Sequence, residues 1–374
     1  MIPASLQNVP KWYIMEKILE EGAFMDVKSV GIIGAGAWGT ALGCALARGG
    51  HNVELWALEE DVTESINSEH ENKRYLPGFS LYPTMTASCD IKKVATDKDF
   101  IIMASPSLYL ASTITKFVDV PNVQNGTSII GSLTKGFVPS DDLPHFVLET
   151  MEDALPECYK NATVYIAGPS HAEEVAMGKI TGLITASEHH RNAIRMRDMM
   201  RVPGLMVYAS FDTIGVQVCA AVKNVIAVVY GSLDALAETS DTFGDNTESL
   251  LMAAGLNEIQ TIGFAMGATH PQTFTSISGV GDLDVTCKSK YGRNRRFGQD
   301  IIKTDMLSRF KDLDDLIANV GKIGYLPEGA IACKYVHQIA EKKNLKLPIC
   351  NALYRLLNKE LTPQECLMSL VERK

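Results

Sequence analysis

Short apolar runs alternate with helix-forming segments through the first half of the chain. Residues 30–33 form a β-branched apolar run, residues 40–48 are rich in Ala and Leu, and residues 52–56 form a second apolar run. Such runs are typical of strands buried on both faces of a parallel sheet, and the segment between them is typical of a helix. The order strand, helix, strand predicts a βαβ unit.

The same alternation continues to about residue 210, with helices between the strands, for example over 143–154. We expect further strands at 99–104, 127–133, 163–167, 182–186 and 205–209. Strands that alternate with helices indicate a parallel, doubly wound sheet. Residues 72–83 contain two prolines and a glycine, and they are predicted to form a loop.

Strand patterns end at about residue 214, and the rest of the chain reads as helical. The predicted helices span 214–236, 247–266, 313–319, 331–342 and 347–358. The sequence therefore predicts an α/β Rossmann-type doubly wound sheet domain followed by an all-α helical domain, since 374 residues exceed one ordinary core. The expected divisions are an N-terminal extension at 1–27, the sheet domain at 28–210 and the helical domain at 211–374. The extension is predicted to contain an amphipathic helix near 12–19.

Three glycines separate the first predicted strand from its helix in the spacing G-x-G-x-x-G: Gly34, Gly36 and Gly39. Gly34 permits the tight turn, Gly36 leaves room for a pyrophosphate beside the backbone, and Gly39 allows close packing of the helix on the sheet. Phosphates would lie at the helix N-terminus, where free N–H groups and the dipole favour negative charge. A glycine turn without a ligand has the same spacing, but the flanking strand and helix favour a dinucleotide site.

An acidic residue about 20 positions past the first glycine commonly binds the adenosine ribose in such a unit. Glu54, Glu59 and Glu60 are the candidates, and the pattern does not choose among them. Neither Arg nor Lys occurs between Asn52 and Lys73 to receive a 2′-phosphate, which favours NAD, with NADP possible. Alternatively, the glutamates mark a solvated helix start, where acidic residues are common.

Composition and charge exclude several classes of protein. A net charge of −9 argues against a nucleic-acid partner. The eight cysteines include no C-x-x-C pair, which argues against a zinc site or a disulfide scaffold, and the histidines show no metal-binding pattern. No signal peptide or peroxisomal tripeptide is recognised, and the longest apolar run, 216–230, is too short for a membrane span. We expect a cytoplasmic protein.

Lys223 is the most informative single residue, because it lies in the almost wholly apolar segment VQVCAAVKNVIAVVY. A helix that is apolar all round is buried, and buried lysines are rare without a partner. Burial favours the neutral amine, which suits acid or base chemistry, although a lysine at the end of a core helix can also reach solvent. Lys135 follows a predicted strand and precedes a glycine, so we expect it at the ligand-binding sheet edge unless it is an ordinary loop lysine.

Residues 279–298 are predicted to form a turn-rich, basic loop. Guanidinium groups bind phosphate through paired hydrogen bonds, so this segment could form an anion-binding site. The alternative interpretation is a solvated basic loop. Either Asp282 or Asp284 could pair with Lys223 and set its protonation. His171 could face the ligand, although a lone histidine is more often structural. The arginines of the basic cluster are Arg293, Arg295 and Arg296.

Over residues 30–368 the chain resembles the NAD(P)-dependent glycerol-3-phosphate dehydrogenase family. The resemblance rests on the ordered blocks GAGAWGTALG, YLPG, SPS, TKG, GPSHAEEVA, and AVKNVIAV with GVGDLDVTC and GRNRRFG. It implies a Rossmann domain plus a helical domain. It also implies reversible hydride transfer between NAD(P)H and dihydroxyacetone phosphate, which gives sn-glycerol 3-phosphate, a precursor of glycerophospholipids. We expect a homodimer that acts on this small phosphorylated substrate.

The resemblance also implies roles for individual residues. Lys223 matches the catalytic lysine of the family. The implied substrate-binding residues are Lys135, Gly168, Ser170, Lys223, Asp282, Thr286, Gly292, Arg293 and Asn294. The implied cofactor-binding residues are Gly34, Gly36, Ala37, Trp38, Gly39, Lys135, Ala172, Arg293, Leu326 and Glu328. No metal is implied.

The expected mechanism follows from the charge that develops during reduction. When hydride reaches the C2 carbonyl, Lys223 as ammonium stabilises the oxygen and then donates a proton, while Arg293 and Asn294 hold the phosphate. Two features depart from the family pattern, namely the extension 1–27 and Glu248, which stands where the family has a base. The alternatives are a related two-domain hydroxyacid dehydrogenase and a non-catalytic module that senses NAD(H).

Overall fold

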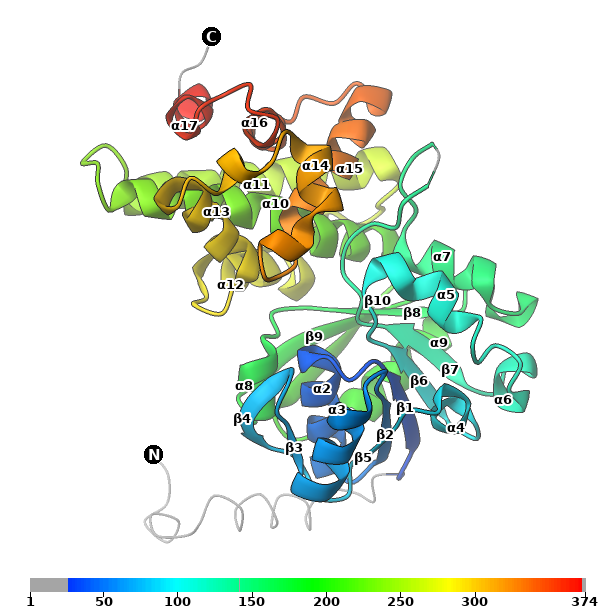
Figure 1. Cartoon of the computed structure of the whole chain (residues 1–374). Coiled ribbons are helices and arrows are strands. Elements are labelled where there is room, and N and C mark those ends of the chain that lie inside the picture. The colour runs from blue at the N-terminus through cyan, green and yellow to red at the C-terminus, as the bar shows by residue number, and fades with distance from the viewer. Residues whose placement is uncertain (1–25, 141, 372–374) are drawn as a thin grey trace, which may run out of the picture.

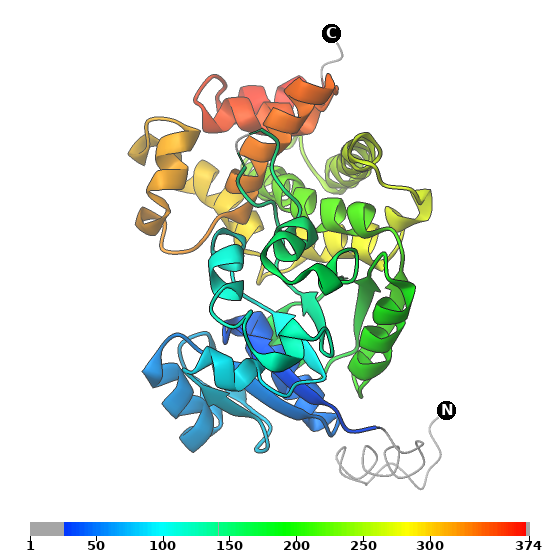
Figure 2. The same cartoon turned by 90° about the vertical axis from the view of Figure 1, so that its right-hand side faces the viewer.

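The computed structural model describes residues 26–140 and 142–371, and it shows a sheet with helices on both faces and a group of helices at one end of it (Figures 1 and 2). The predicted helix near 12–19 lies outside the described residues. The large sheet has the strand order β10-β9-β8-β7-β6-β1-β2-β5. Its strands are β1 (Ser29–Ile33), β2 (Asn52–Trp56), β5 (Thr86–Ser88), β6 (Phe100–Met103), β7 (Ile129–Ser132), β8 (Val164–Ala167), β9 (Thr181–Ala186) and β10 (Leu205–Ser210).

Every strand predicted from an apolar run is present, and the Rossmann-type sheet is confirmed. The prediction of a wholly parallel sheet is wrong at one edge, because β9 pairs antiparallel with β8 and β10 pairs parallel with β9. An apolar run has the same pattern in either direction. The connection from β8 to β9 contains only the short helix α8 (Ala172–Ala176), and it returns the chain to the neighbouring position in the sheet.

The predicted loop at 72–83 is also partly wrong, because it contains most of a small hairpin. Strand β3 (Glu71–Asn72) pairs antiparallel with β4 (Leu76–Ser80). Neither strand shows an apolar alternation, since the side chains of β4 are mostly exposed. Apart from Leu76, which packs in the core, the hairpin is held by polar contacts such as the bond from the N–H of Gly78 to Glu71 Oε1, which hydrophobic periodicity does not reveal.

The glycine turn between β1 and α2 (Ala37–Arg48) has the predicted geometry. Gly34 has φ of +130°, a conformation that other residues rarely adopt, and its N–H donates to the carbonyl oxygen of Trp56 at 3.1 Å. A Cβ on Gly39 would lie 2.1 Å from the carbonyl oxygen of Gly34, so only glycine lets α2 begin this close to the turn. The turn therefore lies at the carboxyl ends of both β1 and β2.

Two apolar layers cover the sheet. One contains α2 and α9 (His190–Met200), and the other contains α4 (Ile91–Ala95), α5 (Leu110–Ile114) and α7 (Val147–Ala154). The remaining helices of this part are α3 (Glu60–Glu64) and α6 (Pro121–Gln124). The first turns of α10 (Thr213–Ala237) contribute Val216 and Ala220 to the second layer, so this helix packs against the sheet before it enters the helical part.

Helix α10 is the centre of the helical part and packs against α11, α12, α13 and α15. It is long and apolar enough to cross a membrane, but 94% of its most apolar window is buried inside the protein, as expected of a core helix.

The prediction of a loop at 279–298 is wrong, because two helices occupy most of this segment. The helices after α10 are α11 (Asp245–Met266), α12 (Asp282–Lys288), α13 (Arg293–Lys303), α14 (Leu313–Ala318), α15 (Glu328–Lys343), α16 (Pro348–Leu357) and α17 (Pro363–Val371).

The error at 279–298 has a physical cause. Helix α13 is strongly polar, and it buries only a narrow stripe that includes Phe297 and Ile301 against α10. Gly298 lies on this stripe, and a Cβ there would come within 2.0 Å of the carbonyl oxygen of Val228. Gly298, one of the glycines that suggested a turn, therefore allows α13 to lie close to α10.

Candidate active site

Lys223 lies in the middle of α10 with its side chain 5% exposed, and it forms an ion pair with Oδ1 of Asp282. Asp282 is the first residue of α12 and is itself 1% exposed. Lys135 follows β7, and its Nζ lies 3.2 Å from the second carboxylate oxygen of Asp282. The predicted pairing of Lys223 with one of the two aspartates thus involves Asp282, because Asp284 pairs with Lys288 at the surface.

Burial dominates the electrostatics of this cluster. Desolvation lowers the pKa of Lys223 to about 7, although the carboxylate of Asp282 raises it and the charge of Lys135 lowers it further. An amine in this range changes protonation near neutral pH, as a general acid and base requires. Burial also lowers the pKa of His171, whose ring Nε2 lies 3.4 Å from the carbonyl oxygen of Val285.

The carboxyl edge of the sheet brings the predicted ligand-binding turns together. Gly168 follows β8 with φ of +143°, and its carbonyl oxygen accepts a hydrogen bond from Ser170 Oγ at 2.8 Å. Lys135 follows the adjacent β7, and the glycine turn follows β1, with β6 between them. On α12, Thr286 lies one turn after Asp282 and donates to its carbonyl oxygen at 2.6 Å.

The predicted pair Arg293–Asn294 separates at the start of α13. Arg293 is exposed, and its Nη2 lies 3.4 Å from Glu328 Oε1 at the start of α15. Asn294 is buried, donates to Asn224 Oδ1 at 3.0 Å and accepts from the N–H of Gly329 at 2.8 Å. Asn294 thus joins α13 to α15 and to α10, at the residue that follows Lys223. Arg293 instead lies near Glu328, a residue predicted to contact the cofactor.

The other predicted residues lie at the starts of helices or just before them. Gly292 caps α13, where a Cβ would lie 3.0 Å from the carbonyl oxygen of Thr286. Ala37 and Trp38 begin α2 and are half-buried, while Ala172 begins α8 and is buried. Leu326 is half-buried and lies just before α15.

Two features of the glycine turn fit a dinucleotide. A Cβ on Gly36 would meet no atom within 4 Å, so the space beside this backbone is open. Ser105 follows β6 and lies against Gly34, and its buried Oγ has no hydrogen-bond partner in the part of the chain that the structure describes. Such an unpaired hydroxyl is costly unless a ligand or water reaches it.

The sequence reasoning missed several polar residues that hold the site. Asp212 is buried at the start of α10 and accepts hydrogen bonds from the N–H of Gly215, the N–H of Thr269 and Oγ1 of Thr273, at 3.1, 3.2 and 2.7 Å. An Asp before a long apolar segment is a capping signal, which could have identified it. Asn72 of the β3–β4 hairpin had no such signal, because its Nδ2 donates to Ala35 and Thr40, which are distant in sequence.

These features define a two-domain nucleotide-dependent dehydrogenase. Its glycine turn lies at the edge of the sheet, and its buried lysine lies on α10, the helix that follows the last strand. The chain belongs to the family of NAD-dependent glycerol-3-phosphate dehydrogenases. The N-terminal model of this family matches residues 29–193, and the C-terminal model matches residues 212–368. The predicted resemblance, fold class and use of NAD(P) are thereby confirmed.

Individual relatives agree with the family models. The glycerol-3-phosphate dehydrogenase [NAD(P)+] of Treponema denticola is 57% identical over 349 residues, which cover 92% of this chain and 98% of that protein. The protein of the same name from Treponema pallidum strain Nichols is 50% identical over 341 residues, covering 89% and 96%. The crystal structure of a glycerol-3-phosphate dehydrogenase from Coxiella burnetii matches this fold with a TM-score of 0.79 and a sequence identity of 30%. The match covers 93% of this chain and 99% of the Coxiella burnetii chain.

Proposed function

We propose that this enzyme transfers hydride reversibly between NAD(P)H and dihydroxyacetone phosphate to give sn-glycerol 3-phosphate, with Lys223 as the general acid and base. The observation that carries the role of Lys223 is its burial in an ion pair with Asp282 at the sheet edge. Family membership and the relatives named above support the reaction. The proposed division places the nucleotide-binding domain at 28–210 and the catalytic domain at 211–374.

The residues of the site would act on one small molecule between the sheet edge and α10. A dinucleotide held by its pyrophosphate at the glycine turn would supply or accept the hydride through its nicotinamide ring. In the direction of reduction, the ammonium of Lys223 faces the carbonyl oxygen, stabilises its growing negative charge and then donates a proton. In the direction of oxidation, the neutral amine of Lys223 removes the proton from the hydroxyl group. Asp282 orients the amine by holding it on one oxygen.

Lys135 and Arg293 are the cations proposed to bind the substrate phosphate and the cofactor. Lys135 is partly exposed beside Asp282, and Arg293 is exposed beside Glu328. A guanidinium binds phosphate through two parallel hydrogen bonds, and this binding energy would orient the carbonyl. Asn294 is proposed to hold α13 and α15 against α10 rather than to bind the phosphate, because both polar atoms of its amide already bind protein partners. A supply of glycerophospholipid precursors, a homodimer and a cytoplasmic location remain part of the proposal.

The purified full chain tests the reaction directly. It is mixed with NADH or NADPH and dihydroxyacetone phosphate, and the loss of absorbance of the reduced nicotinamide is followed. Turnover that depends on the phosphorylated ketone, with glycerol 3-phosphate as product, is expected. Turnover no faster than the background with both cofactors would reject the proposed function.

A further inference from the structure

We propose that Glu59 binds the adenosine ribose hydroxyls and makes this enzyme select NAD over NADP, with Tyr75 as the residue that positions its carboxylate. The inference rests on the dinucleotide site of the proposed function and extends it to the choice between two cofactors. NADP differs from NAD only by a phosphate on the 2′-hydroxyl of this ribose, so the residue that faces the hydroxyl decides the preference.

The place of Glu59 follows from the glycine turn. The N–H of Gly34 donates to the carbonyl oxygen of Trp56, the last residue of β2, so the end of β2 lies beside the turn. Glu59 comes three residues later, is half-buried and immediately precedes α3. An acidic residue after the second strand of such a unit accepts hydrogen bonds from the ribose hydroxyls.

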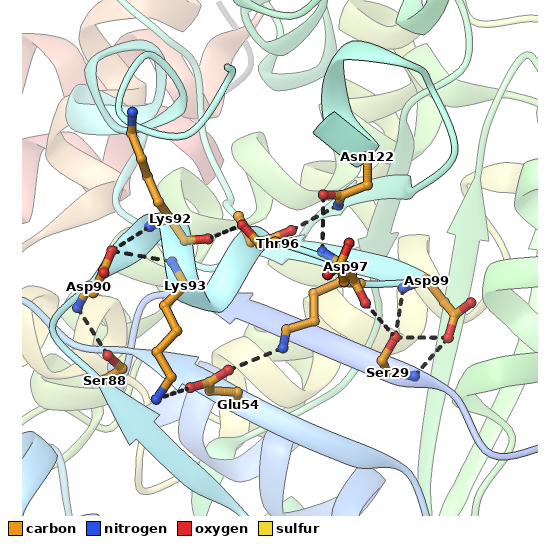
Figure 3. A network of polar contacts seen from close by, with 12 residues as sticks. Ser29, Glu54, Ser88, Asp90, Lys92, Lys93, Thr96, Asp97, Asp99 and Asn122 are labelled. Atoms are coloured by element: carbon orange, nitrogen blue, oxygen red, sulfur yellow. Dashed lines mark hydrogen bonds and ion pairs between the residues drawn. The ribbon is translucent and has the colours of Figure 1, made fainter. Parts of the chain in front are cut away.

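The structure separates Glu59 from the two other candidates. Glu54 lies within β2, and its carboxylate binds Lys93 at 3.2 Å (Figure 3). The second oxygen of this carboxylate lies 3.1 Å from Nζ of Lys98. These ion pairs join β2 to α4 and to the loop before β6, so Glu54 has a structural role. Glu60 begins α3 with its side chain exposed.

A chain of hydrogen bonds links Glu59 to the glycine turn through the β3–β4 hairpin. Asn72 is fully buried, and its Nδ2 donates to the carbonyl oxygen of Ala35 and to Thr40 Oγ1, both at 2.8 Å. Its Oδ1 accepts from the N–H of Tyr75 at 3.0 Å. The hydroxyl of Tyr75 then donates to Glu59 Oε1 at 2.6 Å, which leaves the second oxygen of this carboxylate for a ligand.

The charges around Glu59 disfavour a 2′-phosphate. A carboxylate repels the phosphate, because the two negative groups would lie at hydrogen-bond distance. The nearby cations of the hairpin are already paired, since Arg74 lies 3.6 Å from Asp61 and Lys73 binds Glu69. These four side chains line a surface cavity of about 290 Å³ beside α3, in which the carboxylates of Asp61, Glu64 and Glu69 outnumber the two cations.

The test compares NADH and NADPH in the full-length enzyme, using kcat/KM at saturating dihydroxyacetone phosphate and calorimetric binding of each cofactor. We expect the native enzyme to prefer NADH by about tenfold or more, and Glu59→Gln to reduce this preference by about tenfold, as for a hydrogen bond to a charged group. The change should lie in KM and Kd for the cofactor, while kcat is retained. Tyr75→Phe should move the preference in the same direction by a smaller factor.

Glu60→Gln is the matched control, because it removes the neighbouring charge from an exposed side chain. It should leave the NADH preference unchanged, and thermal unfolding of each variant identifies any that fail to fold. An unchanged preference in Glu59→Gln, or a native enzyme that prefers NADPH, would overturn the inference. Calorimetry needs no turnover, so a chain that binds NADH selectively through Glu59 but does not reduce the ketone would refute the proposed function and leave this inference intact.

Discussion

Lys135 and Lys223 bind opposite oxygens of one carboxylate, that of Asp282. One lysine follows a strand of the sheet, and the other lies on the central helix of the helical part. Asp282 therefore holds two ammonium groups that would otherwise repel each other in a buried place. This arrangement determines which changes should affect the chemistry and which should affect binding.

Lys223→Met should abolish most of the rate without weakening cofactor binding. The methionine has a similar length but cannot donate or accept a proton, so kcat should fall by about 10²–10⁴-fold. Steady-state kinetics measure the loss, and calorimetry with NADH measures the binding. Lys303→Met provides the control, because that lysine forms an exposed pair with Glu238 at the surface. A kcat within a few-fold of the native value would contradict the assigned role.

The pH dependence should follow the protonation of Lys223. Because burial lowers its pKa to about 7, ketone reduction should slow as pH rises through about 7, while alcohol oxidation should accelerate over the same range. The two rates change with pH in opposite directions because reduction needs the ammonium form of Lys223 and oxidation needs its neutral amine. Stopped-flow single turnovers in both directions measure this midpoint separately from product release. Two midpoints that do not coincide would contradict a single shared group.

Variants of the two partners should move this midpoint in opposite directions. Asp282→Asn removes the carboxylate that favours the ammonium, so the midpoint should fall. Lys135→Met removes a positive charge that disfavours it, so the midpoint should rise. Both variants will also lower the rate, and the direction of the shift is the informative result. A common direction for both would show that another group controls the profile.

Arg293→Ala should affect substrate binding, whereas Asn294→Ala should affect the stability of the fold. The exposed Arg293 is proposed to bind phosphate, so its loss should raise KM for dihydroxyacetone phosphate with little effect on folding. The buried Asn294 joins α10, α13 and α15, and its loss should lower the free energy of unfolding by about 1–3 kcal/mol. Kinetics and urea unfolding measure the two effects. An unchanged KM in Arg293→Ala would place the substrate phosphate elsewhere and favour a hydroxyacid substrate.

Asp212→Ala should destabilise the protein more than an average surface change. The carboxylate caps α10 and also holds residues 269–273, so its removal leaves several buried donors unpaired. We expect a loss of about 1–3 kcal/mol in the free energy of unfolding. Urea unfolding of Asp212→Ala beside Asp241→Ala, which alters an exposed turn, measures the difference. Equal stabilities would mean that water replaces the carboxylate without cost.

The sequence was most informative where one local pattern determines structure. Apolar runs located the strands of the large sheet except the short edge strand β5, together with the long helices α10 and α11, and the glycine spacing located the turn at Gly34. Strand direction at β9 was not predictable, because burial has the same signature in parallel and antiparallel strands. The helical state of α13 was missed because its glycine serves close packing, and charged residues cover its outer face.

Within the candidate site, residue types could be predicted more readily than their partners. Lys223 was identified by its apolar neighbours, and its pairing with Asp282 rather than Asp284 depends on which face of α12 points inward. The buried bonds of Asn294, and those that Asn72 Nδ2 donates to Ala35 and Thr40, join residues at least 32 positions apart. Such contacts depend on tertiary packing, which periodicity along the chain does not record.

Helix α10 begins in the layer that covers the sheet and ends as the centre of the helical core, without interruption. Most buried residues of 218–233 complete the core of the helical part, while Val216 and Ala220 belong to the apolar layer that α4, α5 and α7 form on the sheet. Neither core can lose the helix without exposing apolar surface in the other. The two halves should therefore melt together, as a single cooperative calorimetric transition rather than two.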